Sequence, residues 1–140
     1  HGEGFGLPLF EAACNGLPLV TLTWGGQMDF ICKKNKKGKQ VPKVSRVDYD
    51  IKPVQPEAVW PGVIQEDSMW AFAREASFQR ACRDILTKEK FYKKEAELLQ
   101  KHILKNFTSE KMHKEFVDVV LGSDSGSKST ETPEETVLEF

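Results

Sequence analysis

The sequence predicts an α/β fold in which a short buried strand lies between helices, followed by a helical C-terminal third. Two observations predict it. Apolar residues at helical spacing follow Pro8 and stop at Gly16, and a β-rich run comes directly afterwards at residues 17–23. A glycine pair and a second, short helix-forming segment come next, at residues 25–32. Strand, tight turn and helix in this order are typical of half a parallel sheet.

Each of these first elements has a local cause. Pro8 suits the first turn of a helix, because it lacks an N–H that would have no partner there. Gly16 supplies the left-handed residue that closes many helices. The run at residues 17–23 is apolar, partly β-branched and bounded by turn-forming residues, which predicts a buried strand. The glycine pair predicts a turn, and residues 28–32 a short helix.

The middle of the chain, residues 33–66, breaks this pattern. Its lysine run at residues 33–39 is too polar for a core and predicts a solvated loop. Apolar and charged side chains alternate towards the end of residues 44–51, which predicts one strand. Residues 69–73 are compatible with a strand or a helix, and we favour the strand. Four prolines are expected to keep the connection irregular: Pro42, Pro53, Pro56 and Pro61.

The last third is predicted to be helical. Helices are expected at residues 76–86 and 88–107, and the second carries an apolar stripe that predicts burial. Thr108 is a suitable N-cap for a last helix that Gly122 ends. We therefore expect one domain over residues 1–121 and a flexible acidic tail over residues 122–140. The stripe consists of Tyr92, Ala96, Leu99, Ile103 and Phe107.

The composition is that of an ordinary globular protein. Of the 140 residues, 39% are hydrophobic and 29% are charged, and the formal net charge is -1. A chain this close to neutral is not expected to capture nucleic acid through its overall charge, so we expect no nucleic-acid partner.

Three cysteines without a Cys-x-x-Cys spacing indicate reduced, packed thiols in the cytoplasm. No apolar run approaches the roughly 20 residues that span a bilayer.

The richest motif lies at the start of the chain. Glu3 and Glu11 are eight positions apart, with a glycine-containing loop and a helix start between them. Gly4 and Gly6 allow the backbone to come close to a ligand. The helix that begins near Leu7 offers N–H groups and the positive end of its dipole to a phosphate. A carboxylate on the first full turn can accept two hydroxyl hydrogens, as from the diol of a ribose.

The whole string resembles the Glu-x7-Glu signature of retaining GT-B glycosyltransferases of the group 1, family 4 type. The likeness is tight over residues 2–30 and loose over residues 67–121. It implies a Rossmann-like half of a GT-B C-terminal lobe, with C-terminal helices. The matching residues are Glu3-Gly4-Phe5-Gly6-Leu7-Pro8, Glu11-Ala12, Gly16-Leu17-Pro18, Val20 and Gly25-Gly26.

The resemblance implies a role for each residue of the string. Glu3 would be the catalytic carboxylate that meets the hydroxyls of the transferred sugar, and the backbone of Gly4-Phe5-Gly6 would line that sugar. The helix start at Leu7 would receive the diphosphate, and Glu11 would hold the ribose. Backbone donors and the helix dipole would stabilise the departing nucleoside diphosphate. The resemblance thus implies sugar transfer with retention, and neither a metal nor a cofactor is expected.

Departures from the family pattern limit this expectation. Asp29 stands where the family usually has a Glu, Asn15 where a smaller residue is usual, and residues 33–66 are longer than the usual connection. In these enzymes the basic residues that offset the diphosphate, and the acceptor-binding lobe, precede the position of Glu3. We therefore expect the chain to be the C-terminal donor-binding part of a longer enzyme, able to bind a donor but not to turn over alone.

The same resemblance sets the expected partners. These are a nucleotide-sugar donor, the missing N-terminal lobe, and an acceptor that the sequence does not identify, whether a glycan, a lipid or a protein. The expected location is the cytoplasm, with attachment to a membrane surface as an alternative.

Two other functions stay open at the level of sequence. The first is a non-catalytic scaffold derived from such a lobe, which would use the lysine run and the acidic tail as contacts. The second is a nucleic-acid binder that would use residues 33–43 and would lose affinity steeply with salt. The lack of interleaved aromatic residues in the lysine run disfavours it.

Structural roles are expected for the three tryptophans and for two of the three histidines. The tryptophans are expected to pack in the core or at a lobe interface, rather than to stack on a sugar or a base. His102 and His113 lie on charged helices without a partner at ligand spacing, so we expect them at the surface. His1 is the one histidine close enough in sequence to reach the donor. The tryptophans are Trp24, Trp60 and Trp70.

Overall fold

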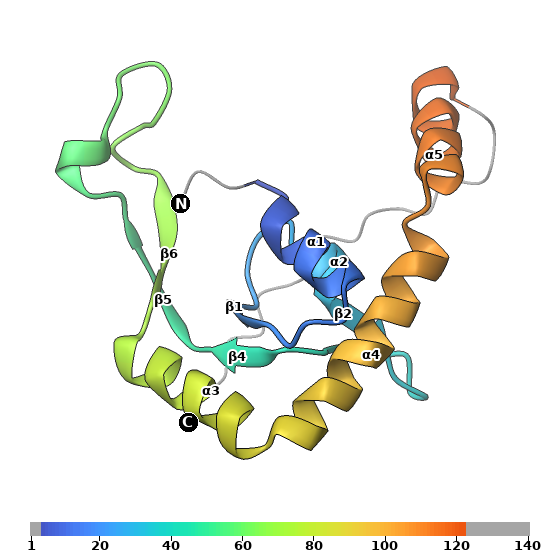
Figure 1. Ribbon diagram of the computed structural model, residues 1–140. Coiled ribbons are helices and arrows are strands. Elements are labelled where there is room, and N and C mark those ends of the chain that lie inside the picture. The colour runs from blue at the N-terminus through green and yellow to red at the C-terminus, as the bar shows by residue number, and fades with distance from the viewer. Residues whose placement is uncertain (1–3, 123–140) are drawn as a thin grey trace. The chain divides into compact units, whose positions relative to one another are not determined.

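The computed structural model describes residues 4–122 and has a mixed α/β fold, as the sequence predicts (Figure 1). The chain forms two compact units, of which the first ends at Thr108 and the second begins at Ser109. Among the described residues there are three two-stranded sheets, one parallel and two antiparallel. The parallel arrangement expected from the sequence is therefore limited to one pair of strands.

The first helix, strand and short helix occur in the predicted order. α1 (Leu7–Cys14) begins after Gly6, whose φ of 89° is left-handed. It ends before Gly16, which has a φ of 71°, so the predicted closing glycine is confirmed. β1 (Val20–Leu22) is shorter than the predicted run, and α2 (Met28–Ile31) follows the glycine turn. Local residue chemistry is sufficient to place these elements.

The parallel pair is held against a helix by a buried hydroxyl. β1 pairs with β4 (Ser45–Val47). Ser45 is buried, and its Oγ donates to the backbone carbonyl of Ala81 at 3.1 Å. Ala81 belongs to α3 (Glu75–Thr87) and is itself buried. The parallel strands are thus covered by a helix, which parallel strands generally require.

The lysine run is not the solvated loop that the sequence predicts. Residues 32–42 form a hairpin of β2 (Cys32–Lys34) and β3 (Gln40–Pro42), called here the lysine hairpin. The Oδ1 of Asn35 accepts two backbone amide hydrogens from lysines further along the turn, at 2.9 and 3.0 Å. Gly38 supplies a φ of 78°. These local turn contacts close the hairpin although its lysines are exposed.

The single strand predicted at residues 44–51 is two strands. Asp48 separates β4 from β5 (Tyr49–Pro53), and its backbone amide donates to the Oγ of Ser77 at 2.9 Å. The chain therefore leaves the parallel pair at Asp48. β5 pairs antiparallel with β6 (Met69–Ala73). The strand favoured for residues 69–73 is confirmed, but it belongs to this hairpin and not to the parallel pair.

The prolines disturb the chain less than the sequence predicts. Pro42 and Pro53 are the last residues of β3 and β5. A proline is tolerated at a strand end, because the missing N–H breaks no interior ladder bond. Pro56 begins the short 3-10 helix η1 (Pro56–Ala58) in the connection to β6.

The core of the first unit lies between α1, α2, β2 and α4 (Glu89–Asn106), which Figure 1 shows close together. The predicted stripe on α4 is confirmed at Ala96, Leu99 and Ile103, which are all buried. The two end residues of the stripe, Tyr92 and Phe107, are half-buried. The buried core residues are Ala13, Leu19, Phe30, Ile31, Cys32, Val44, Leu99 and Ile103.

The second unit contains α5 (Ser109–Leu121). The helix starts directly after Thr108, the predicted N-cap, and stops before Gly122, whose φ is 61°. None of its residues is buried. The tail predicted for residues 122–140 lies outside the described residues from Ser123 onwards. Within residues 4–122, no helix combines the length and the apolar character needed to cross a bilayer.

The three cysteines are free thiols, as the sequence predicts. Burial raises the pKa of the Cys32 thiol, and the nearby positive charge of Arg46 partly opposes this shift. Burial also raises the pKa of Cys14, and the Glu11 carboxylate adds to the rise. Both thiols are therefore held protonated and unreactive near neutral pH.

Acid should weaken the contact between Asp48 and α3. The Nη2 of Arg80 donates to the Oδ2 of Asp48 at 2.9 Å. This hydrogen bond holds the pKa of Asp48 below its usual range, and a hydrogen bond with Ser77 lowers that pKa to a smaller extent. Because the folded pKa is the lower one, the stabilisation is present above the unfolded pKa of about 4 and is lost as pH falls through the folded value.

The expected result is a urea midpoint that drops between about pH 6 and about pH 3, with a smaller drop in Arg80→Gln. Urea unfolding followed by circular dichroism measures it. The effect should be modest, because Arg80 and Asp48 are 60% and 48% exposed. Arg83→Gln is the matched control, an exposed arginine on the same helix. Equal acid sensitivity in both variants would contradict the prediction.

Candidate functional site

The loop before α1 is built to present its backbone. Gly6 has a left-handed φ of 89°, and its carbonyl accepts the amide hydrogen of Phe10 at 2.9 Å, which starts the helix. Gly6 itself is buried, whereas Gly4 and Leu7 are exposed. The first residue of this eight-residue helix is thus at the surface. Such an end favours an anion, because the peptide dipoles put partial positive charge there.

The loop rests directly on the glycine turn that follows β1. A Cβ on Gly26 would overlap the carbonyl oxygen of Gly4 and would lie 3.4 Å from the Cα of Phe5. A Cβ on Gly6 would lie 3.3 Å from the Cβ of Gln27. Gly26 therefore permits an approach of two backbones that no other residue allows.

Gln27 fastens this turn to the end of β1. Its Nε2 donates to the Oγ1 of Thr21 at 2.9 Å and to the carbonyl of Leu22 at 2.7 Å. Thr21 and Leu22 are the last two residues of β1. The loop before α1 is therefore tied, through the turn, to the carboxyl end of a parallel strand. That end is where ligands bind in α/β sheets.

The side chain of Phe5 anchors the loop from the other side. Its ring lies 5.4 Å from the ring of Phe10 and 5.1 Å from that of Phe30, between ring centroids. Phe30 is fully buried in the core. Aromatic pairs at this separation are favourable. The loop is thus fixed to the core through the side chain of Phe5.

Glu11 lies one turn into α1 and is exposed. Its backbone carbonyl accepts a hydrogen bond from the Nδ2 of Asn15 at 2.8 Å. This contact uses the backbone of Glu11 and not its carboxylate. None of the ion pairs within residues 4–122 uses Glu11. The carboxylate is therefore accessible to a polar ligand.

The structure brings most of the predicted site residues together. Gly4, Phe5, Gly6, Leu7 and Glu11 lie on one continuous loop and helix. The predicted catalytic carboxylate, on Glu3, lies outside the described residues, and so does the histidine expected near the donor, on His1.

Two of the three tryptophans lie outside the core. Trp24 is 46% exposed and Trp60 is 65% exposed, so neither packs in the core, and the other predicted place, a lobe interface, stays a prediction for both. Trp24 and Trp70 line a cavity of about 430 Å³ beside the glycine turn, together with residues of β6. Sequence reasoning missed this cavity, because Trp24 and Trp70 are far apart in the chain and meet only through the β5–β6 hairpin.

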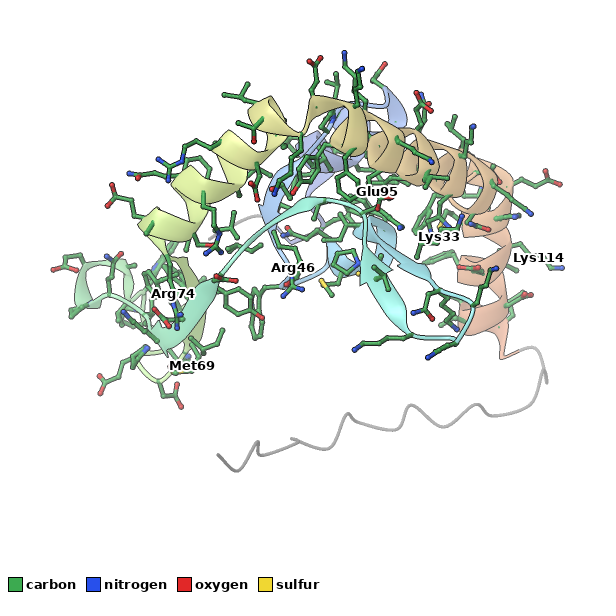
Figure 2. The ribbon with its side chains drawn as sticks, turned by 90° about the horizontal axis from the view of Figure 1, so that it is seen from below. Lys33, Arg46, Met69, Arg74, Glu95 and Lys114 are labelled. Atoms are coloured by element: carbon green, nitrogen blue, oxygen red, sulfur yellow. The ribbon has the colours of Figure 1, made fainter. Side chains whose placement is uncertain are left out.

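A second cavity, of about 310 Å³, lies at the lysine hairpin. It is lined by Lys33, Lys34 and Lys36 of the hairpin and by Leu98 of α4. Nearby, the Nζ of Lys43 is 2.8 Å from the Oε2 of Glu95, an ion pair that connects this region to α4. Figure 2 labels Lys33 and Glu95 in the same part of the first unit. Lys43 also lines the cavity, in addition to the three lysines of the hairpin.

One Asp-x-Asp triplet bears on the expectation that no metal is bound. Asp48 and Asp50 flank Tyr49 at the start of β5. The Asp48 carboxylate pairs with Arg80, and the Asp50 carboxylate accepts from the Nε of Arg74 at 3.0 Å. Both carboxylates are therefore neutralised by arginines. Within the described part of the chain, no three His, Cys, Asp or Glu side chains are placed to share a metal ion.

The two described histidines differ in environment. His113 is exposed on α5, as predicted. His102 is half-buried, and its Nδ1 lies 2.9 Å from the Nδ2 of Asn106. Burial, followed by the nearby charge of Lys33, lowers the pKa of His102. The prediction of a surface position is therefore only partly correct for His102.

Comparison of the chain with models of protein families, with curated proteins and with solved structures gives no match. The function must therefore be argued from the residues and their geometry.

Proposed function

We propose that this chain is the donor-binding part of a retaining GT-B glycosyltransferase and binds a nucleoside diphosphate sugar. The observation that carries the proposal is the Gly4–Gly6 loop. It leads into α1 while it rests on Gly26 at the carboxyl end of β1. The same residues form the Glu-x7-Glu string, so motif and geometry support one assignment.

The proposed chemistry uses separate groups for separate parts of the donor. The start of α1 receives the diphosphate, because the helix dipole favours negative charge there. Glu11, four residues further, accepts the hydroxyl hydrogens of the ribose. Glu3 meets the sugar as the catalytic carboxylate. Charge on the leaving diphosphate is stabilised by backbone donors, without a metal.

The proposal includes a Rossmann-like sheet completed by a further part of the protein. β1 and β4 are three residues each and form a sheet of only two strands. Sheets in globular proteins usually have four to six strands, and an isolated pair is marginally stable. A neighbouring lobe that extends this pair would supply the acceptor site and the basic residues that the donor phosphates need.

Calorimetric titration with UDP-glucose, GDP-mannose and ADP-glucose tests the proposal. One of the three is expected to bind the chain, and Glu11→Ala should weaken it about ten- to a hundredfold, as expected for lost hydrogen bonds to a carboxylate. Glu97→Ala, another exposed glutamate on a helix, is the matched control and should bind like the parent chain. Absence of heat with all three donors, or equal affinity in Glu11→Ala, would reject the proposal.

The lysine hairpin favours a second candidate function, a non-catalytic module that binds an anionic surface. Residues 33–43 contain six lysines and no acidic residue, and residues 33–40 are all exposed. In a cytoplasmic protein the anionic surface would be a membrane, and each lysine near such a surface contributes about 1 kcal/mol. The same hairpin could also hold the proposed enzyme at a membrane, where a lipid acceptor lies.

Co-sedimentation with phosphatidylcholine vesicles, with and without phosphatidylserine, tests the hairpin. Binding is expected only to the anionic vesicles and should fall with salt. Replacing Lys34, Lys36 and Lys37 together by Gln should weaken it on the order of a hundredfold, from about 1 kcal/mol per lysine. The matched control replaces three exposed lysines of α4, Lys90, Lys94 and Lys101. Equal loss in both triple variants would show that overall charge, not the hairpin, is responsible.

A further inference from the structure

The cavity at the lysine hairpin is lined by none of the residues of the proposed donor site. The hairpin lies beside α4 (Figure 1), and Leu98 of α4 lines the cavity together with residues of the hairpin. Its volume of about 310 Å³ is at the lower end of the usual range of small-molecule sites. We infer that this cavity binds a phosphomonoester group and that the lysines lining it hold the negative charge of that group.

Most of the lysines of the cavity have no anionic partner. In the part of the chain that the structure describes, no ion pair uses Lys33, Lys34 or Lys36. The Nζ of Lys43 is held 2.8 Å from the Oε2 of Glu95, and both side chains are only 19% exposed. Glu95 thus offsets one of the four positive charges, and three ammonium groups are available to an anion.

A phosphomonoester matches this set of charges better than a carboxylate or a phosphodiester does. Near neutral pH it carries about 1.5 to 2 negative charges and three acceptor oxygens, whereas each of the other two groups carries a single charge. One phosphate can therefore pair with two or three ammonium groups, to which it binds as point charges. It also offsets the repulsion between lysines that line the same cavity.

An amide and two apolar residues complete the cavity. The Oδ1 of Asn35 accepts the two amide hydrogens that close the hairpin turn, and no hydrogen bond among residues 4–122 uses its Nδ2. Asn35 therefore has two hydrogens to donate to phosphate oxygens. Val41 and Leu98 line the same cavity and are half-buried. Such apolar walls displace water, and the attraction between opposite charges is stronger where less water surrounds them.

NMR titration of the 140-residue chain with myo-inositol 1,4-bisphosphate and with inorganic phosphate tests the site. Saturable shifts of the Asn35 side-chain amide are expected. Lys34→Gln with Lys36→Gln should weaken binding about tenfold or more, because two charged contacts are lost. Asn35→Asp should weaken it to a similar extent, since the added carboxylate repels phosphate but still accepts the amide hydrogens that close the turn.

The matched control is Lys37→Gln with Lys39→Gln. It removes the same charge from the same hairpin, and both lysines are exposed, but neither lines the cavity. This double variant should bind both soluble probes like the parent chain.

A co-sedimentation experiment in about 0.15 M salt decides where the phosphomonoester comes from. It compares phosphatidylcholine vesicles that contain phosphatidylinositol 4-phosphate with vesicles of equal surface charge that contain phosphatidylserine, whose phosphate is a diester. Only this second experiment rests on the membrane function proposed for the hairpin. A preference for the phosphoinositide that is lost in Lys34→Gln with Lys36→Gln, and kept in the control, identifies a lipid headgroup. Binding of the soluble probes without such a preference supports the site and identifies a free phosphorylated small molecule.

Two results would overturn the inference. The first is the absence of saturable shifts with both soluble probes together with equal binding to the two kinds of vesicle, which keeps the membrane function of the hairpin without the cavity. The second is equal weakening in the two double-lysine variants, which assigns binding to the overall charge of the hairpin. The donor site is judged separately, by the Glu11→Ala titration, because none of residues 4–11 lines this cavity.

Discussion

Gly26→Ala is expected to displace the loop before α1 and to weaken donor binding while the fold persists. The added Cβ would overlap the carbonyl oxygen of Gly4, which is backbone and cannot rotate away. Overpacking of this kind costs about 1–3 kcal/mol of unfolding free energy. The loop can avoid the overlap only by moving away from the turn, and this would misplace the backbone that the proposed donor contacts.

The measurements are urea unfolding and calorimetric titration with the nucleotide sugar that binds the parent chain. Donor affinity should fall by about tenfold or more, since a displaced loop loses at least one hydrogen bond to a charged group. Gly38→Ala is the control, because it strains a left-handed residue in the lysine hairpin but meets nothing within 4 Å. Unchanged stability and affinity in Gly26→Ala would show that the loop does not rest on the turn.

Leu99→Ala is expected to cause the largest loss of stability of any truncation on α4. Leu99 is 0% exposed and lies in the core cluster between α1, α2 and α4. Its replacement by Ala removes buried methyl groups and leaves a cavity, which costs about 2–5 kcal/mol. A loss of this size is a large share of the roughly 5–15 kcal/mol that holds a typical domain folded.

Leu104→Ala provides the comparison on the same helix, because Leu104 is 58% exposed. It should change the urea midpoint little, since surface truncations usually stay within about 0.5 kcal/mol. Urea unfolding of both variants measures the two losses of stability. Similar losses in the two variants would mean that the face of α4 assigned to the core is wrong.

The elements that the sequence predicts well have local causes. α1 follows from a proline in its first turn and a glycine after its end, and the stripe on α4 follows from helical spacing alone. The buried positions of that stripe, Ala96, Leu99 and Ile103, are the predicted ones. Such signals are contained in a few neighbouring residues, so no partner from elsewhere in the chain is needed to read them.

The errors concern how strands pair and where they break. The lysine run has strand partners because an Asn and a Gly close a turn that its charge composition conceals. Residues 44–51 contain the alternation of one strand, yet Asp48 is bound by Ser77, which is 29 residues further along the chain. Hydrophobic alternation cannot show where a third segment interrupts a strand, so the break was not predictable.

The candidate site divides in the same way. The sequence by itself determined the motif that we propose binds the donor, because the backbone freedom of Gly4 and Gly6, the helix start and the carboxylate of Glu11 are all local features. Only the tertiary structure decided that the loop rests on Gly26, and that Trp24 and Trp70 share a cavity. Contacts between residues 20 or more positions apart depend on how strands pair and where the chain turns back. That geometry is a property of the whole fold, and no short run of residues contains it.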